Sequence, residues 1–234
     1  MKILKLLPAM FGLIMASTTA TAVTFFYDPT TPYLSDSDIP AGFYAGGSPT
    51  FLDDLEDGTL DGGITGTGTH GVIGAIPGLF TNLIDSVGNG GDPTVGHSWF
   101  SLDPAEVTFF FPASVTAAGL VWTDGGSGGV VFEAFGPGMV SLGSIGPFDI
   151  ADGSSSGTTA EDRFFGAKDP GGIIAIKISN NGKGIEVDHI QYGDGYAAPG
   201  SNVPPASSVP DSGTSFILLL GTLSLFTALR KRLA

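Results

Sequence analysis

The sequence predicts an all-β fold, a β-sandwich of jelly-roll type, and three observations lead to this prediction. Apolar runs rich in Phe, Val and Ile are short, and glycine-rich turns separate them. Residues 174–178 alternate isoleucine with alanine and lysine, the period-two pattern of a strand with one face in water. Only residues 77–87 have the apolar spacing of a helix. Many short strands with little helix favour two packed β layers.

Eight segments have the length and apolar content of strands. They are residues 23–27, 107–111, 118–123, 130–135, 139–145, 163–167, 173–179 and 185–192. Residues 124–129 are rich in glycine and are predicted to form a hairpin loop between the two strands that flank them.

The composition restricts the classes of partner. The formal net charge is −14, so the chain repels phosphate backbones and anionic membrane surfaces, and we expect no nucleic-acid binding. There is no cysteine, so stability must come from a packed core, for which 17 phenylalanines provide the side chains. We expect no required cofactor.

The N-terminus has the three parts of a secretory signal peptide over residues 1–22. Lys2 and Lys5 flank the start of an apolar run over residues 6–15, and Ala20 and Ala22 form a small-x-small cleavage site. The predicted partners at this stage are the secretion machinery and signal peptidase, with cleavage after Ala22.

The rest of the chain divides into three parts. Residues 23–195 are one β-sandwich domain, and residues 196–208, rich in Pro, Ser, Ala and Gly, are a flexible linker. Residues 209–234 contain an uncharged segment with a transmembrane helix expected at about 214–229, before a basic stop formed by Arg230, Lys231 and Arg232. Because its apolar part rises only about 21 Å as a helix, this span is marginal for a ~30 Å hydrocarbon core. The basic cluster should stay cytoplasmic, which places the body outside.

The residues just before this span carry a resemblance. Val209, Pro210, Asp211, Ser212 and Gly213 read VPDSG, and with the apolar segment and basic end they resemble the PEP-CTERM sorting signal in its VPDSG variant. The resemblance implies that an exosortase, a membrane-embedded cysteine protease or transpeptidase, removes the tail. The chain would then be anchored in the inner membrane transiently and end at the cell surface or outside the cell. The alternative is an ordinary C-terminal anchor.

Much of the body also resembles a domain common among exported PEP-CTERM proteins. The resemblance is carried by residues 83–100, 118–136 and 157–193. It implies export and a β-sandwich, and it supplies no catalytic residue.

An acidic turn is the stretch with the most chemical potential. Five carboxylates lie within residues 53–61, and calcium, which takes 6 to 8 oxygen ligands, would relieve their repulsion. In jelly-roll carbohydrate-binding modules, an acidic turn near the first strand often shares a structural calcium with the last strand. By that resemblance the metal ligands would be Glu56, Asp57 and Asp188. A solvated acidic loop is the alternative.

Three functions follow from these patterns. The first is a non-enzymatic surface or extracellular-matrix protein whose tail an exosortase processes. The second is a carbohydrate-binding module that holds a glycan on exposed aromatics such as Trp99, Trp122 and Tyr192. The third is a hydrolase, suggested by two G-x-S-x-G matches at 125–129 and 153–157, which would need a serine, a histidine and an acid to converge.

Overall fold

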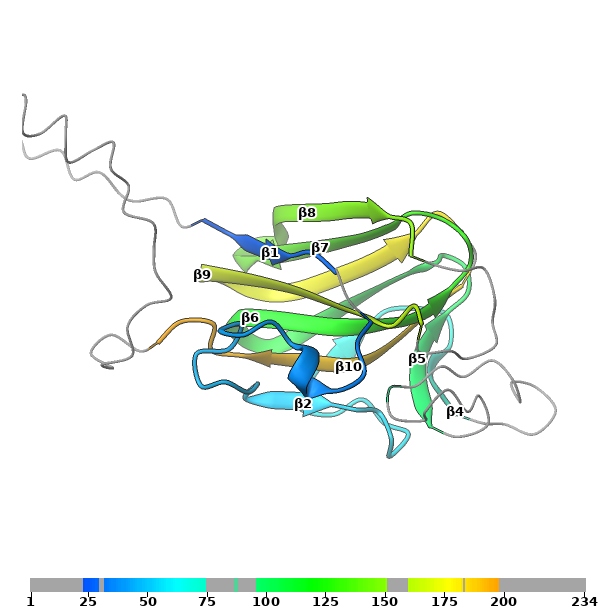
Figure 1. The fold of residues 1–234 in the computed structure, drawn as a ribbon, viewed down its shortest axis with the longest axis horizontal. Coiled ribbons are helices and arrows are strands. Elements are labelled where there is room, and N and C mark those ends of the chain that lie inside the picture. The colour runs from blue at the N-terminus through cyan, green and yellow to red at the C-terminus, as the bar shows by residue number, and fades with distance from the viewer. Residues whose placement is uncertain are drawn as a thin grey trace, which may run out of the picture.

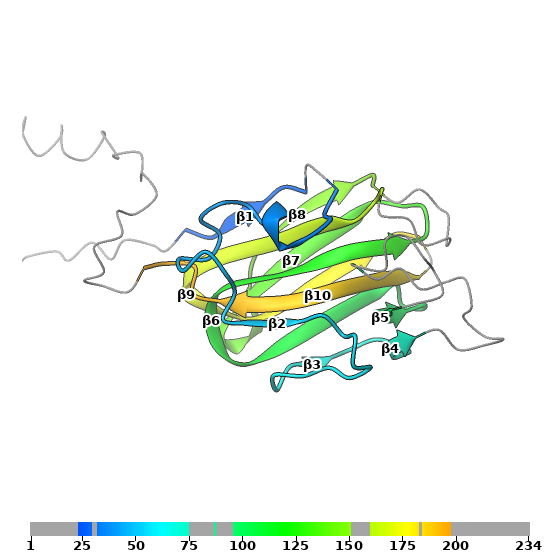
Figure 2. The same ribbon diagram turned by 60° about the horizontal axis from the view of Figure 1, so that its bottom comes forward.

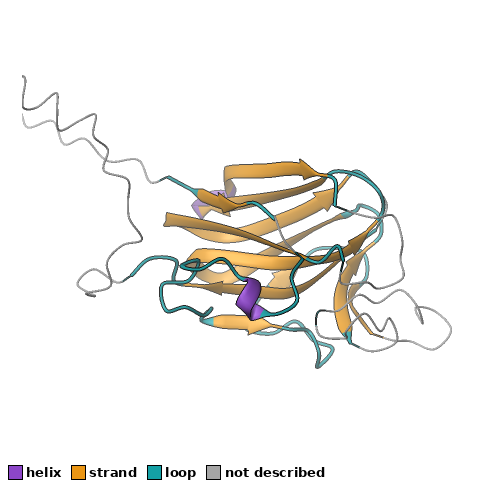
Figure 3. Ribbon diagram, in the orientation of Figure 1, coloured by secondary structure: helices purple, strands orange, loops and turns teal. Residues whose placement is uncertain are grey.

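The structure is a computed structural model that describes residues 23–29, 32–74, 87, 96–150, 160–182 and 184–197. These residues form ten strands and two single-turn 3₁₀ helices (Figures 1 and 3). The strands are β1 (Phe25–Tyr27), β2 (Phe51–Asp53), β3 (Thr65–Gly66), β4 (Gly71–Gly74), β5 (His97–Ser101), β6 (Glu106–Gly125), β7 (Val130–Gly136), β8 (Val140–Phe148), β9 (Arg163–Asn180) and β10 (Ile185–Gly193). The helical turns are η1 (Asp36–Asp38) and η2 (Pro137–Met139). The all-β prediction is therefore confirmed.

All ten strands belong to one antiparallel sheet. Its main path runs β4-β5-β10-β6-β9-β7-β8, while β1 pairs with β9, β2 with β10, and β3 with β6. Figure 2, turned from the first view, shows how the strands are distributed over two layers. The jelly-roll type of connectivity stays a prediction.

The two longest strands, β6 and β9, join the layers because both bend. Their pairing is regular from Glu106↔Ser179 to Phe110↔Ala175, shifts around Val115↔Ile173, and is regular again from Ala117↔Lys168 onward. The first half of β6 lies with the second half of β9, beside β3 and β7. The second half of β6 lies with the first half of β9, beside β10 and β1. One continuous sheet thus folds into two facing layers.

The main hydrophobic core lies between these layers. Phe132 on β7 packs against Phe165 on the first half of β9, with ring centroids 5.8 Å apart. Trp99 on β5 contacts Phe109 on the first half of β6 edge-on, at 5.4 Å. Each of these pairs joins one layer to the other, and all four rings belong to one buried cluster. The predicted aromatic core is built by inward-facing positions of both layers.

A second, smaller core covers the outer face of the layer that contains β10. Tyr33, Phe43 and Tyr44, from the segment between β1 and β2, pack on Val121 and Phe164. Phe43 meets Phe164 edge-on with centroids 5.1 Å apart. This outer face also carries the buried polar groups described below.

Three sequence predictions differ from the fold. The predicted strands 107–111 and 118–123 are continuous in β6, and 163–167 and 173–179 are continuous in β9, because the chain bends there without leaving the ladder. The predicted hairpin at 124–129 is wrong: β9 lies between β6 and β7, so this turn carries the chain from one layer to the other. Strands β2 to β5 were not predicted, since each has five residues or fewer and none shows a long apolar alternation.

Other predictions concern residues outside the described part of the chain. These are the signal peptide at 1–22, most of the 77–87 helix, and most of the linker and tail at 196–234. None of the helices formed by the described residues has the length and apolar character that crossing a bilayer requires.

Candidate functional site

The acidic turn at 53–61 is held by its own carboxylates and leads out of β2. The carboxylate of Asp53, which is buried, accepts hydrogen bonds from the backbone N–H of Leu55 at 3.0 Å and from that of Asp61 at 2.5 Å. Leu55 is fully buried and has a φ of 57°, a left-handed conformation that is uncommon for a branched side chain. Burial raises the pKa of Asp53, whereas the two backbone donors lower it.

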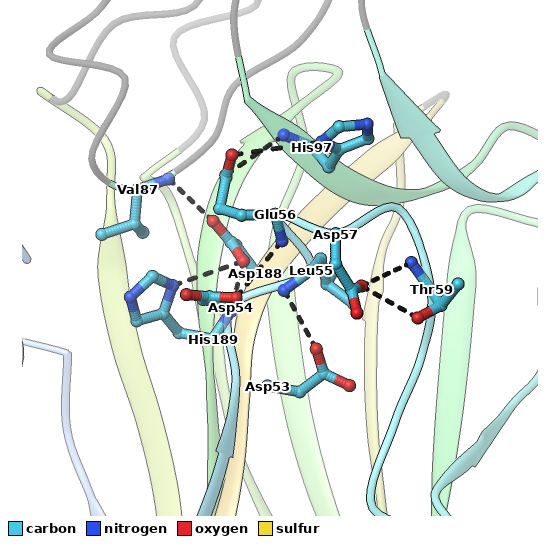
Figure 4. A network of polar contacts seen from close by, with 10 residues as sticks. All are labelled: Asp53, Asp54, Leu55, Glu56, Asp57, Thr59, Val87, His97, Asp188 and His189. Carbon is cyan, nitrogen blue, oxygen red and sulfur yellow. Dashed lines mark hydrogen bonds and ion pairs between the residues drawn. The ribbon is translucent and has the colours of Figure 1, made fainter.

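The three carboxylates predicted to bind calcium have different partners (Figure 4). Glu56 points to His97, whose N–H lies 3.2 Å from Oε1. Asp57 is exposed and accepts hydrogen bonds from the N–H and hydroxyl of Thr59 at 2.9 and 2.8 Å, which lower its pKa. Asp188 is fully buried on β10. Within the described ranges, no three Asp, Glu or His side chains lie together in a way that could hold a metal ion. Calcium binding at Glu56, Asp57 and Asp188 stays a prediction.

Asp188 is instead part of a buried ion pair with its neighbour. His189 has a φ of 48° at the irregular point of β10 between Asp188 and Gln191, and this turns its ring back toward the carboxylate. Nδ1 of His189 lies 3.3 Å from Oδ1 of Asp188, which also accepts the His189 N–H at 2.6 Å. The other oxygen accepts the N–H of Val87 at 2.8 Å.

The two partners titrate in a way that follows from this geometry. Burial raises the pKa of Asp188, and the contacts with His189 only partly offset that effect. Burial lowers the pKa of His189, but the Asp188 carboxylate outweighs it and the pKa of His189 is raised overall. Tyr33 covers this pair: its ring lies edge-on to that of His189 at 5.9 Å, and its hydroxyl donates to Asp36 at 2.8 Å.

The structure reveals a second group of acids that sequence reasoning missed. We define the buried acidic cluster as Asp124, Glu161, Asp162 and Asp188, all of which are 5% exposed or less. Burial raises the pKa of Asp162 to about 8, and the negative charges of the other three members add to the rise, while Arg163 opposes it. One sequence feature could have indicated this cluster, because two of its acids lie next to predicted strands. Asp124 follows the predicted strand 118–123, and Asp162 precedes the predicted strand 163–167.

Strand pairing explains the position of one member of the cluster, Asp188. Val121 on β6 pairs with both Phe164 on β9 and Asp188 on β10, so the three side chains share the outer face. Thr123 is the extra residue where the pairing of β6 with β10 shifts, between Trp122↔Val187 and Asp124↔Glu186. Asp162 directly precedes β9. Strand pairing therefore places Asp188 beside Val121 and Phe164, next to Tyr33.

The aromatic residues proposed for glycan binding do not form an exposed platform. Trp122 is fully buried and Trp99 is 8% exposed, because both belong to the core between the layers. Tyr192 is half-buried and stacks on Phe51 with centroids 5.3 Å apart. The prediction that these rings are exposed is wrong for both tryptophans.

One of the two G-x-S-x-G matches lies in the described part of the chain and lacks the local structure of a nucleophile elbow. The match at 125–129 lies between two strands, β6 and β7, whereas a nucleophile elbow joins a strand to a helix. The second match, at 153–157, lies outside the described residues, as do the cleavage residues Ala20 and Ala22 and the sorting motif.

Comparison with known proteins adds no assignment to this geometry. No protein-family model matches the chain, and no curated protein matches it.

Proposed function

We propose that this chain is an exported, non-enzymatic surface or extracellular-matrix protein whose C-terminal tail is a PEP-CTERM-type sorting signal processed by an exosortase. The body would be a jelly-roll-like β-sandwich, delivered through the secretion machinery and held in the inner membrane until the tail is removed. The lysines and small residues of the N-terminus and the VPDSG motif with its basic end support this proposal.

The observation that carries the proposal is that the two ends of the body lie side by side. Phe25 pairs with Lys168 on β9, and the Thr24 hydroxyl donates to Asp169 at 2.5 Å. From the other end of the body, the ring of Tyr196 lies 5.0 Å from Nζ of the same lysine. Because both ends of the body lie at one place, a membrane anchor there would leave the rest of the body's surface free for contacts outside the cell.

One feature of the fold supports the jelly-roll part of the proposal. The chain changes layer between β6 and β7, and β6 separates β9 from β10, whereas β4–β5 and β7–β8 are antiparallel neighbours. Connections that cross between layers are typical of jelly rolls and Greek keys.

The test is mass spectrometry of the mature protein from a culture that has the variant exosortase. The proposal expects an N-terminus at Val23 and a C-terminus that lacks the apolar segment and the basic stop. A dominant form that retains Arg230, Lys231 and Arg232 would establish a plain anchor. Recovery from the cytoplasm with Met1 intact would overturn export itself.

A further inference from the structure

Asp169 on β9 is a buried carboxylate whose hydrogen-bond donors are both neutral. It is 3% exposed. The Gly171 N–H donates to Oδ1 at 2.7 Å, and the Thr24 hydroxyl donates to Oδ2 at 2.5 Å. None of the ion pairs in the part of the chain that the structure describes includes Asp169. A buried carboxylate in this state carries a desolvation cost that a cation beside it would offset.

The lysine next to Asp169 has other partners. Nζ of Lys168 donates to the backbone carbonyl of Gly42 at 2.8 Å and lies 5.0 Å from the centre of the Tyr196 ring. A carboxylate has about four lone-pair sites, so Asp169 can accept further hydrogen bonds beyond the two that it receives. The neighbouring lysine therefore does not supply the missing cation, although the carboxylate has capacity for one.

The beginning of β1 lies directly beside this carboxylate. Phe25 pairs with Lys168 in an antiparallel register, so Thr24 lies opposite Asp169, and the hydrogen bond from the Thr24 hydroxyl holds the two together (Figure 1). Val23 comes one residue earlier and is 61% exposed. The backbone nitrogen of Val23 is thus one residue away from the side chain that binds Asp169, and it belongs to a residue that water can reach.

Removal of the proposed signal peptide creates a cation at this nitrogen. Hydrolysis of the peptide bond between Ala22 and Val23 adds one water molecule across it, and leaves a carboxylate on Ala22 and an ammonium group on Val23. Before cleavage the Val23 nitrogen is a neutral amide. After cleavage it is an α-amino group, which is mostly protonated at neutral pH.

We propose that the ammonium group of Val23 forms an ion pair with the Asp169 carboxylate and holds β1 on β9. The inference rests on the proposed function, because it needs export and cleavage after Ala22. It couples processing to stability: the precursor has no cation on this nitrogen, and the mature body gains one. Since β1 has only three residues and carries Phe26 into the main core, a bond at its beginning stabilises the edge of the sandwich.

The test compares two chains that differ by one residue, 23–234 and 22–234, so that the terminal amine is on Val23 or on Ala22. Both are released from a fusion by a protease that leaves no extra residue, which makes the result independent of cleavage in the cell. Acetic anhydride reacts only with the neutral amine, and mass spectrometry of the N-terminal peptide gives the rate. At neutral pH we expect the Val23 amine to react about tenfold more slowly than the Ala22 amine, because an ion pair with a carboxylate stabilises the ammonium form.

The melting temperatures of the two chains measure the coupling to stability. A tenfold preference for the paired form corresponds to about 1.4 kcal/mol, so chain 23–234 should melt about 3 to 6 °C higher than chain 22–234. This difference should disappear when Asp169 is replaced by asparagine, because the amide carries no charge.

Two matched variants of chain 23–234 locate the partner of the amine. Asp169→Asn keeps the shape of the side chain, and it should bring the reaction rate of the Val23 amine up to that of the Ala22 amine. Asp28→Asn, which removes an exposed carboxylate just after β1, should leave the amine slow. Lys177, paired with Glu133 at 3.1 Å, is the internal standard, since its rate changes only if a variant unfolds.

The outcomes separate this inference from the proposed function. Equal rates for the Val23 and Ala22 amines, or for the native chain and a folded Asp169→Asn, overturn the ion pair alone, because the general negative charge of the body would then act on the amine. Equal melting temperatures of the two chains overturn the coupling to stability. A mature N-terminus other than Val23 in culture overturns the inference together with the proposed cleavage.

Discussion

Burial of Asp162 opposes its ionisation, so the stability of the fold should depend on pH through this residue. Because burial raises its folded-state pKa to about 8 from 3.8, folding takes up a proton at pH values between those two. The contribution of Asp162 to the free energy of unfolding should therefore be fully present below about pH 3.8 and fall as pH rises toward 8, by up to about 1.4 kcal/mol per pH unit. The raised pKa values of Asp188 and His189 act in the same direction.

The measurement is urea unfolding at pH values from 5 to 8.5. Asp162→Asn cannot ionise, so its free energy of unfolding should fall less over this range than that of the native chain. Asp57→Asn is the control, because the pKa of Asp57 is lowered and its loss cannot reduce the slope. Equal slopes for the native chain and Asp162→Asn would show that Asp162 is not held in the buried state described.

Substitution of Trp122 tests the packing of the core between the layers at the level of one residue. It is fully buried between the layers, so Trp122→Ala should cost about 3 to 5 kcal/mol of stability. Val140→Ala is the control, since Val140 is 63% exposed and its loss should change stability by no more than about 0.5 kcal/mol. Chemical denaturation followed by circular dichroism compares the two. A loss of less than about 1 kcal/mol in Trp122→Ala would contradict the buried position that excludes this ring from glycan binding.

At the scale of single elements, the bend in β9 depends on Gly172. Its φ of 98° is strained for any other residue, and a Cβ there would collide with the Ser114 hydroxyl on β6. Gly138, between β7 and β8, has a φ of 76° but open space around the position of a Cβ. Gly138→Ala thus reports the backbone strain alone, about 1 to 2 kcal/mol.

Gly172→Ala should cost at least as much as Gly138→Ala, because the same backbone strain is accompanied by displacement of the exposed Ser114 side chain. Urea denaturation of both variants gives the two losses. A clearly smaller loss for Gly172→Ala would contradict the left-handed backbone at the bend of β9.

At the scale of the whole molecule, the proposed sorting tail can be tested without disturbing the body. Replacing Pro210 and Asp211 with alanines should leave a full-length precursor in the membrane fraction, because the motif that the protease reads is lost. Changing Ser207 and Ser208 to alanines, just before the motif, is the matched control and should leave processing intact. Immunoblots of membrane and medium fractions make the comparison. Equal processing of both variants would contradict recognition of VPDSG.

The sequence alone determined that the long apolar segments enter the sheet, although not the short strands β2 to β5, because period-two alternation and apolar content are local properties. The strands from Val130 to Gly136 and from Ile185 to Gly193 were predicted within one or two residues. Local patterns also predicted that the acidic turn would exist. They could not show that β9 lies between β6 and β7, since partners in an antiparallel sheet are chosen by the packing of distant segments.

Only the tertiary structure decided which side chains meet. Trp99 and Trp122 were buried when two layers closed over them, which no single strand pattern reveals. The buried acidic cluster is Asp124, Glu161, Asp162 and Asp188, and the pairing of β6 with β9 and β10 positions Asp188 in it. Residues separated by tens of positions become neighbours through register, and register is fixed by burying the apolar face of every strand at once. The chain therefore encodes its strands locally and its buried acidic cluster only through the complete fold.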